Sequence, residues 1–188
     1  MRLRIVLTAL ALAMAGCDRQ AATSDAGADA PKLDAPAPET LPSRVFAPTN
    51  DAATAATGQI TAAMTLRLPD AGQANAESQE VLTLTGANGV IVEAELTGAM
   101  SPATQVQGQT LRALLSIPVE EPQVLVYRVS NETRPNGQGI CGGDTAASVV
   151  VWEPAGPGEP VMKVLGVMGG APGVASARAC PMLEYRRS

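Results

Sequence analysis

Apolar and polar residues alternate with a period of two over much of the chain beyond Gly58. Residues 60–68 place an apolar side chain at every second position, and residues 90–97 repeat the pattern. Because successive side chains of a strand point to opposite faces, this alternation predicts half-buried β-strands. Residues 81–85 predict a strand between them, and the Gly-Ala-Asn-Gly segment 86–89 predicts a hairpin turn, since Asn and Gly tolerate positive φ.

The second half of the chain predicts further short strands that are rich in β-branched and aromatic residues. They cover residues 124–129, 148–153, 161–167 and 182–186. The segment Thr110 to Leu115 fits one or two helical turns, with a strand as the alternative in these β-rich surroundings. Short strands joined by Gly and Pro turns are typical of an antiparallel sandwich or small barrel. We therefore expect an all-β, mainly antiparallel domain of about seven strands over residues 58–188.

The N-terminus carries a different pattern. A basic start, Met1 to Arg4, precedes ten uncharged apolar residues, Ile5 to Met14. This run has the length of a signal-peptide core and falls short of the roughly 20 residues that cross a bilayer. An ordinary secretory signal, cleaved at another position, is one interpretation of this pattern.

The residues that end this run, Met14 to Cys17, resemble the lipobox of bacterial lipoproteins. In that family the signal peptide is removed before the cysteine, which is diacylated with fatty acids such as palmitate. The resemblance implies a signal peptide over residues 1–16, a lipid on Cys17, and attachment to a membrane of the bacterial cell envelope on its periplasmic side. Asp18 resembles an inner-membrane retention signal of enteric bacteria, but the choice between inner and outer membrane stays open.

Residues 17–57 are expected to form an Ala- and Pro-rich disordered linker. Between Asp18 and Pro42 almost no large apolar residue is present, and four prolines interrupt every window long enough for a helix. The end of this stretch admits two interpretations. Val45 and Phe46 either belong to the linker or pack on the domain, and Asn50 is a candidate cap for a short helix that ends at Gly58.

Composition excludes several classes of function. The chain has no histidine, so it cannot build a Ser-His-Asp triad, an imidazole proton shuttle or a histidine-ligated metal site. Its net charge of -5, without a basic run, argues against nucleic acid as a partner. We therefore expect no enzyme activity, no metal and no cofactor.

Two cysteines remain if Cys17 is lipidated. Cys141 and Cys180 are expected to form a disulfide, because paired cysteines persist in oxidising compartments such as the periplasm. Closing a loop of this length contributes about 4 kcal/mol in the chain-entropy model. The bridge would tie the loop before the Trp152 strand to the start of the last strand.

Two motifs match the patterns of functional sites, and each also has a simpler structural interpretation. Residues 137–142 match the G-x-G-x-x-G dinucleotide pattern, but the residues that follow predict a strand, where a phosphate site requires a helix N-terminus. A glycine-lined disulfide loop explains the same residues. Glu93 and Glu95 lie on one strand face at a spacing that suits a glycosidase pair, but any two acidic residues two positions apart have this spacing, so a solvated strand face is the simpler interpretation.

Arginines concentrate in the C-terminal half of the chain. A candidate contact surface consists of Arg128, Arg134, Arg178 and Arg186. The alternative interpretation is that these arginines are scattered over the surface and favour solubility. The loops around Cys141 and Gly169 are further candidate contact regions.

The lipobox, the Ala/Pro linker and the β domain together resemble small envelope lipoproteins of proteobacteria. This resemblance implies a location and no activity. We expect a lipid-anchored, non-enzymatic binding or structural module whose partner is an envelope protein or a glycan. Periplasmic lysozyme inhibitors share the size, the anchor and a disulfide-tied β barrel, so an inhibitor or sensor of a glycan hydrolase is the alternative.

Overall fold

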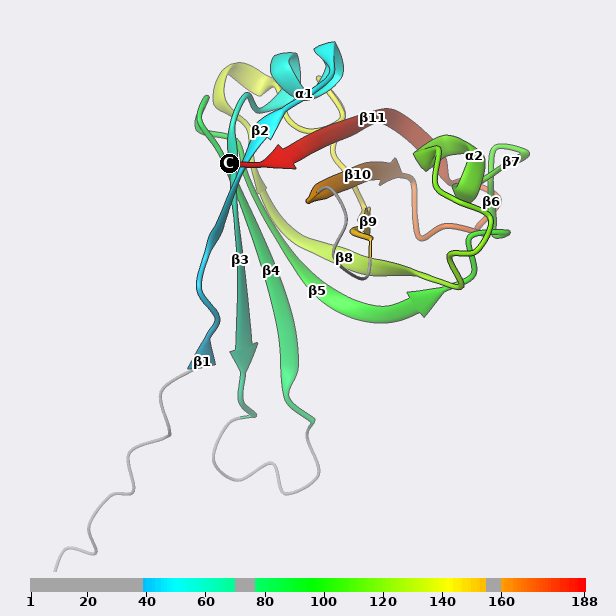
Figure 1. Ribbon diagram of the computed structural model, residues 1–188, viewed down its shortest axis with the longest axis horizontal. Coiled ribbons are helices and arrows are strands. Elements are labelled where there is room, and N and C mark those ends of the chain that lie inside the picture. The colour runs from blue at the N-terminus through cyan, green and yellow to red at the C-terminus, as the bar shows by residue number, and fades with distance from the viewer. Residues whose placement is uncertain (1–38, 70–76, 155–159) are drawn as a thin grey trace, which may run out of the picture. The chain divides into compact units, whose positions relative to one another are not determined.

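The long strands of the protein follow one another around a closed barrel (Figure 1). The computed structural model describes residues 39–69, 77–154 and 160–188. The barrel strands are β2 (Arg44–Pro48), β3 (Ile60–Arg67), β4 (Gln79–Gly86), β5 (Ile91–Met100), β8 (Val124–Thr133), β9 (Ser148–Trp152), β10 (Val161–Met168) and β11 (Arg178–Arg187). Each strand pairs antiparallel with the next one in this series, and β11 pairs with β2 to close the ring. The fold is therefore an up-and-down β-barrel.

The protein also contains shorter elements beside the eight barrel strands. They are β1 (Glu39–Thr40), α1 (Asp51–Ala56), β6 (Gln105–Val106), β7 (Gln109–Thr110), α2 (Leu111–Leu115) and a 3-10 turn (Pro135–Gly137). β1 pairs with the last part of β3, beyond the residues that pair with β2. The chain therefore enters the barrel at the end where β3 finishes and β4 begins.

One apolar cluster fills the barrel, and every barrel strand contributes to it. Phe46 on β2 and Tyr185 on β11 are each 1% exposed. On β9, Val149 and Val151 belong to this interior cluster, whereas the intervening Val150 belongs to a second cluster outside the barrel. The period-two alternation of the sequence thus separates the inside of the barrel from its outer surface.

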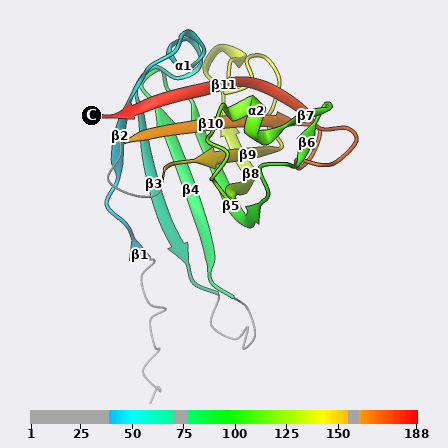
Figure 2. The same ribbon diagram turned by 45° about the vertical axis from the view of Figure 1, so that its right-hand side comes forward.

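The second apolar cluster joins α2 to the outer surface of the barrel. Figure 2 shows α2 beside the barrel strands, where it contacts β10 and β11. The Oγ1 atom of Thr110 accepts a hydrogen bond from the backbone N–H of Ala113 at 3.2 Å and caps this helix. Leu111 and Leu115, four residues apart on one helix face, are fully buried. They belong to the same cluster as Trp152 of β9, so α2 covers one side of the barrel.

One end of the barrel is closed by α1. The Oδ1 atom of Asn50 accepts a hydrogen bond from the N–H of Ala53, and its Nδ2 donates to the carbonyl of Met182 on β11, each at 2.9 Å. Ala53 is fully buried against the barrel. The hydroxyls of Thr57 and Tyr185 lie 2.7 Å apart beneath this helix. Burial raises the pKa of Tyr185 to about 12, although the Thr57 hydrogen bond opposes the shift.

All seven predicted strands are present, and the alternative of a barrel is confirmed over that of a sandwich. The expected turn at residues 86–89 joins β4 to β5, and residues 111–115 form a helix. The barrel has one strand more than expected, and this additional strand is β2. The expected signal peptide, Cys17 and most of the expected linker lie outside the described residues.

The expected domain boundary at residue 58 is too late. β2 pairs with both β3 and β11, so the ring closes only with residues that we had assigned to the linker. Of the two interpretations of this stretch, the structure supports packing of Phe46 in the core and a short helix capped by Asn50. The physical reason is that a barrel without β2 would leave two unpaired strand edges.

Candidate functional site

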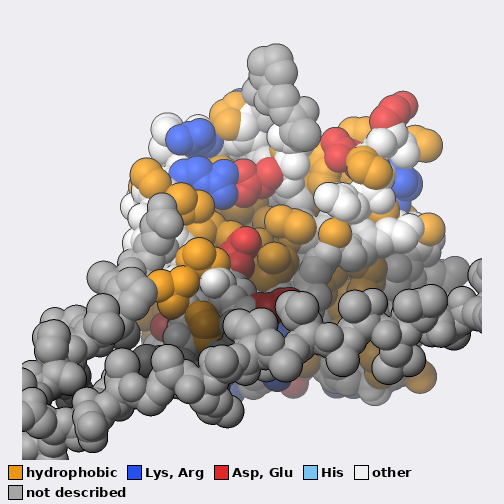
Figure 3. Space-filling model, turned by 90° about the horizontal axis from the view of Figure 1, so that it is seen from below, with side chains coloured by type: hydrophobic (Ala, Val, Ile, Leu, Met, Phe, Trp, Pro, Cys, Tyr) orange, Lys and Arg blue, Asp and Glu red, His pale blue; other side chains and the backbone are white. Residues whose placement is uncertain are grey.

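A pocket of about 350 Å³ lies at the end of the barrel opposite α1. Its walls include Met64, Leu82, Leu125, Val151 and Met162, which come from five different barrel strands. The strand register places these side chains in phase with the buried interior residues, so the pocket is the open continuation of the apolar core. Figure 3 views this end of the barrel and shows hydrophobic side chains gathered around acidic ones.

An ion pair spans the interior at this opening. The Nη2 atom of Arg44 donates to Oε1 of Glu153 at 2.8 Å, and Nη1 contacts the second carboxylate oxygen. Arg44 begins β2, whereas Glu153 follows β9, and two strands separate them around the ring. The guanidinium also lies 5.4 Å from the ring centroid of Phe46. Both charged side chains are about a third exposed, 33% and 31%, so the pair forms part of the pocket rim.

A second polar contact lies beside this ion pair. The hydroxyl of Tyr127 on β8 donates to Oε1 of Glu80 on β4 at 3.2 Å. The pKa of Tyr127 lies far above its usual value, first because burial disfavours the phenolate and then because the carboxylates of Glu80 and Glu153 repel it. Arg44 opposes this shift. Tyr127 therefore acts as a hydrogen-bond donor in the pocket wall and stays protonated at neutral pH.

A smaller hollow of about 200 Å³ adjoins the main pocket on the side of β1. It is lined by Leu41, Leu66 and Glu80 and shares Met64 with the main pocket. Leu41 and Leu66 are 55% and 37% exposed. The apolar surface of the opening thus extends from the barrel interior towards the point where the chain enters the barrel.

This arrangement suits the binding of a small molecule. Its walls are mostly apolar with a few charged groups at the rim, as in pockets that hold small molecules, and its volume is at the lower end of the range for such sites. In the part of the chain that the structure describes, no group of three or more acidic or cysteine side chains is placed to hold a metal ion.

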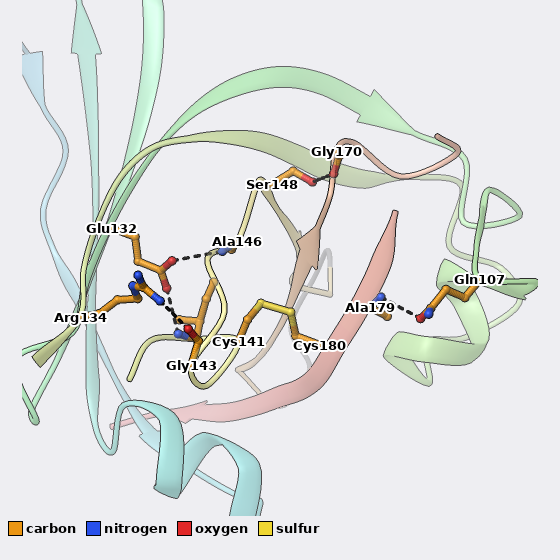
Figure 4. The surroundings of a disulfide bond; sticks show 11 residues. Gln107, Glu132, Arg134, Cys141, Gly143, Ala146, Ser148, Gly170, Ala179 and Cys180 are labelled. Carbon is orange, nitrogen blue, oxygen red and sulfur yellow. Dashed lines mark hydrogen bonds between the residues drawn. A yellow bond between two sulfur atoms is a disulfide. The ribbon is translucent and has the colours of Figure 1, made fainter. Parts of the chain in front are cut away.

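The cysteines predicted to pair do so. Cys141 and Cys180 form a disulfide with their Cα atoms 5.2 Å apart, and it joins the loop before β9 to the start of β11 (Figure 4). The carboxylate of Glu132 accepts hydrogen bonds from the N–H groups of Ile140 and Ala146, at 3.0 and 3.1 Å, and fixes the same loop. This bridge lies at the closed end of the barrel, away from the main pocket.

The glycine-rich motif at residues 137–142 belongs to this disulfide loop. Gly139 and Gly142 face each other in a tight antiparallel bridge, and the chain then continues into β9. A dinucleotide site requires a helix N-terminus after the glycines. The structure therefore supports the disulfide-loop interpretation of this motif. A hollow of about 260 Å³ separates the loop from α1.

Glu93 and Glu95 lie on the outer surface of the barrel. Glu95 is paired with Arg67 at 3.5 Å and with Arg128 on β8, and the carboxylate of Glu93 accepts a hydrogen bond from Asn131 at 3.4 Å. Val92 and Ala94 alternate with these glutamates along β5 and belong to the interior cluster, so Glu93 and Glu95 point outward. The solvated strand face is therefore the interpretation that the geometry supports.

The structure does not gather the candidate arginines into one surface. Arg178 and Arg186 are eight residues apart on β11, a distance of about 26 Å along a strand. Arg128 is engaged with Glu95 on β8, and Arg134 donates to the carbonyl of Gly143 at 2.7 Å in the disulfide loop. Arg128 and Arg134 thus stabilise local structure.

The residues at the pocket rim did not stand out in the sequence. A signal was nevertheless present, because Glu80 is in phase with the inward Leu82 and Leu84, and Glu153 is in phase with Val151. A charged residue at an inward position near the end of a strand is unexpected for a simple core. It indicates a polar mouth of a barrel.

Comparisons with known proteins leave this site to be interpreted from its geometry. No protein-family model matches the chain, and neither a curated protein nor a solved structure matches it. Within residues 39–69, 77–154 and 160–188, no helix is both long and apolar enough to cross a membrane.

Proposed function

We propose that this protein is a non-enzymatic binding module of the bacterial cell envelope, and that the open end of its barrel holds a small, largely apolar molecule. The observation that carries the proposal is the pocket of about 350 Å³, in which the apolar core opens to solvent beneath the Arg44–Glu153 ion pair. Apolar walls supply affinity by removing ligand surface from water, and the few polar groups at the rim orient the ligand.

The location in the envelope rests on the sequence. The lipobox-like segment Met14 to Cys17 supports a lipid anchor on Cys17, and the Cys141–Cys180 disulfide is compatible with an oxidising compartment. A lipid anchor would hold the barrel at a membrane surface, where small apolar molecules concentrate. In this arrangement the ligand comes from the membrane or the periplasm.

A neutral fluorescent probe, N-phenyl-1-naphthylamine, tests the binding function. Trp152 is the only tryptophan of the chain and lies next to the pocket, so a probe held there should quench its emission. The probe should bind to the full chain with increased emission and quench Trp152. Leu125→Gln should weaken binding about five- to tenfold, because it replaces a pocket wall by a polar side chain.

Val174→Gln is the matched control. Val174 is 50% exposed, comparable with Leu125 at 37%, but does not line the pocket. This variant should bind the probe as the unaltered chain does. Equal losses in both variants, or no binding by the unaltered chain, would contradict the proposal. Capture of a lysozyme by a chain that binds no probe would favour the alternative of a glycan-hydrolase inhibitor.

A further inference from the structure

The charged groups around the pocket differ in how far each is neutralised. Arg44 and Glu153 satisfy one another, because two nitrogens of the guanidinium contact both carboxylate oxygens. Such a two-point pair leaves neither group with much charge or hydrogen-bonding capacity for a ligand. The remaining charged side chains therefore decide which ligands the opening favours.

Glu80 is a carboxylate at the opening that has no such ion-pair partner among the described residues. Its side chain accepts a hydrogen bond from Tyr127, and none of the ion pairs between described residues includes it. Tyr127 lines the main pocket and Glu80 lines the adjoining hollow, and the two spaces share Met64. The Glu80 carboxylate thus lies at the junction of two apolar spaces, and no cation among residues 39–69, 77–154 and 160–188 neutralises it.

The electrostatics of Tyr127 agree with this geometry. Besides burial, the carboxylates of Glu80 and Glu153 raise its pKa, and Arg44 only partly opposes them. Glu121 also lines the main pocket and adds a third acidic side chain to its rim. Three carboxylates thus surround the opening, and Arg44 is the cation among the described lining residues. The opening disfavours anions and favours cations.

We infer that the ligand is a cationic amphiphile, with an apolar body in the barrel mouth and a positively charged amine beside Glu80. This inference rests on the proposed binding function and specifies its ligand class. An amine at this position would find a carboxylate acceptor at the edge of an apolar cavity. A fatty acid of the same size would bring its own negative charge towards the same group.

A matched ligand series tests the inference. Octylamine, octanol and octanoate share one alkyl chain and differ in head-group charge at neutral pH. Each would compete with N-phenyl-1-naphthylamine for the full chain. Octylamine should bind about fivefold tighter than octanol, as expected for one partly exposed ion pair, and octanoate should bind most weakly. Added salt should reduce the difference between the amine and the alcohol.

Glu80→Gln should abolish the difference in affinity between octylamine and octanol, since glutamine carries no charge but still offers an oxygen to the Tyr127 hydroxyl. Glu93→Gln is the control, because Glu93 lies on the outer surface and its removal changes the net charge equally. It should retain the preference.

The outcomes separate this inference from the proposed function. If octanol competes with the probe but octylamine binds no better, the cationic ligand class is wrong and the binding function stands. If none of the three alkyl compounds competes, the pocket does not hold small apolar molecules and both proposals fail. The series on the unaltered chain decides the matter even if Glu80→Gln fails to fold.

Discussion

Individual glycines show how closely the closed end of the barrel is packed. A Cβ atom on Gly166 of β10 would lie 2.6 Å from Sγ of Cys141 and 3.2 Å from Sγ of Cys180. These distances are shorter than van der Waals contact, so only glycine allows the disulfide to cross this strand. Gly139 is similarly restricted, because its Cβ would lie 2.2 Å from the carboxylate of Glu132.

Gly166→Ala should therefore destabilise the fold by about 1–3 kcal/mol, the usual cost of an extra methyl group in a filled space. The measurement is the midpoint of urea unfolding, with the disulfide content determined by thiol titration of the denatured chain. Gly143→Ala is the control, because a Cβ at Gly143 meets no atom within 4 Å and its φ is not positive. Equal midpoints for the two variants would show that the disulfide is not confined by β10.

Among the elements, β2 is a short strand on which closure of the barrel depends. It has five residues, yet it pairs on one side with β3 and on the other with β11. It also brings Phe46 into the core and Arg44 to the pocket rim. The barrel and its candidate site thus both require a segment that precedes the predicted domain.

A fragment that begins at residue 58 should fail to form the barrel, because β3 and β11 would each expose an unpaired edge. A fragment of residues 39–188 retains β2 and should give the same near-ultraviolet circular dichroism as the full chain. Size-exclusion chromatography should show the shorter fragment as aggregated. A monomeric, cooperatively folding fragment 58–188 would mean that β2 is dispensable.

Within element β2, the matched pair Phe46 and Val45 checks the same point. Phe46 is 1% exposed inside the barrel, whereas Val45 is 38% exposed on the outer surface. Phe46→Ala should lower the free energy of unfolding by about 3–5 kcal/mol, and Val45→Ala should lower it much less.

At the scale of the whole molecule, the proposed anchor and the pocket relate to the same end of the barrel. β1 pairs with the last residues of β3, so the described chain begins beside the open end and the hollow that contains Leu41. If Cys17 is lipidated, the connection to the membrane starts from the end of the barrel that holds the pocket.

Cys17→Ser tests the anchor in a bacterium that processes lipoproteins. The unaltered chain should sediment with membranes and carry the mass of its fatty acids, and the variant should appear in the soluble fraction. Binding of N-phenyl-1-naphthylamine should be the same in both, since the pocket lies in the barrel. An unmodified thiol at position 17, or equal membrane association of both chains, would rule out lipidation at this residue.

The sequence alone predicted most of the barrel because strand formation leaves a local signal. Alternation with a period of two marked the strands that became β3 and β5, and Asn and Gly marked the turn between β4 and β5. Cys141 and Cys180 were paired by elimination, and their bridge is present. The sequence also carries the whole argument for a lipid on Cys17.

Tertiary structure decided what depends on residues far apart in the chain. Closure requires β2 to meet β11, and a strand as short as β2 has little periodicity by which to recognise it. The pocket requires Arg44 to meet Glu153 and Tyr127 to meet Glu80, and no local pattern contains such contacts. Periodicity tells which side of a strand faces inward, but the ring decides which inward residues share an opening.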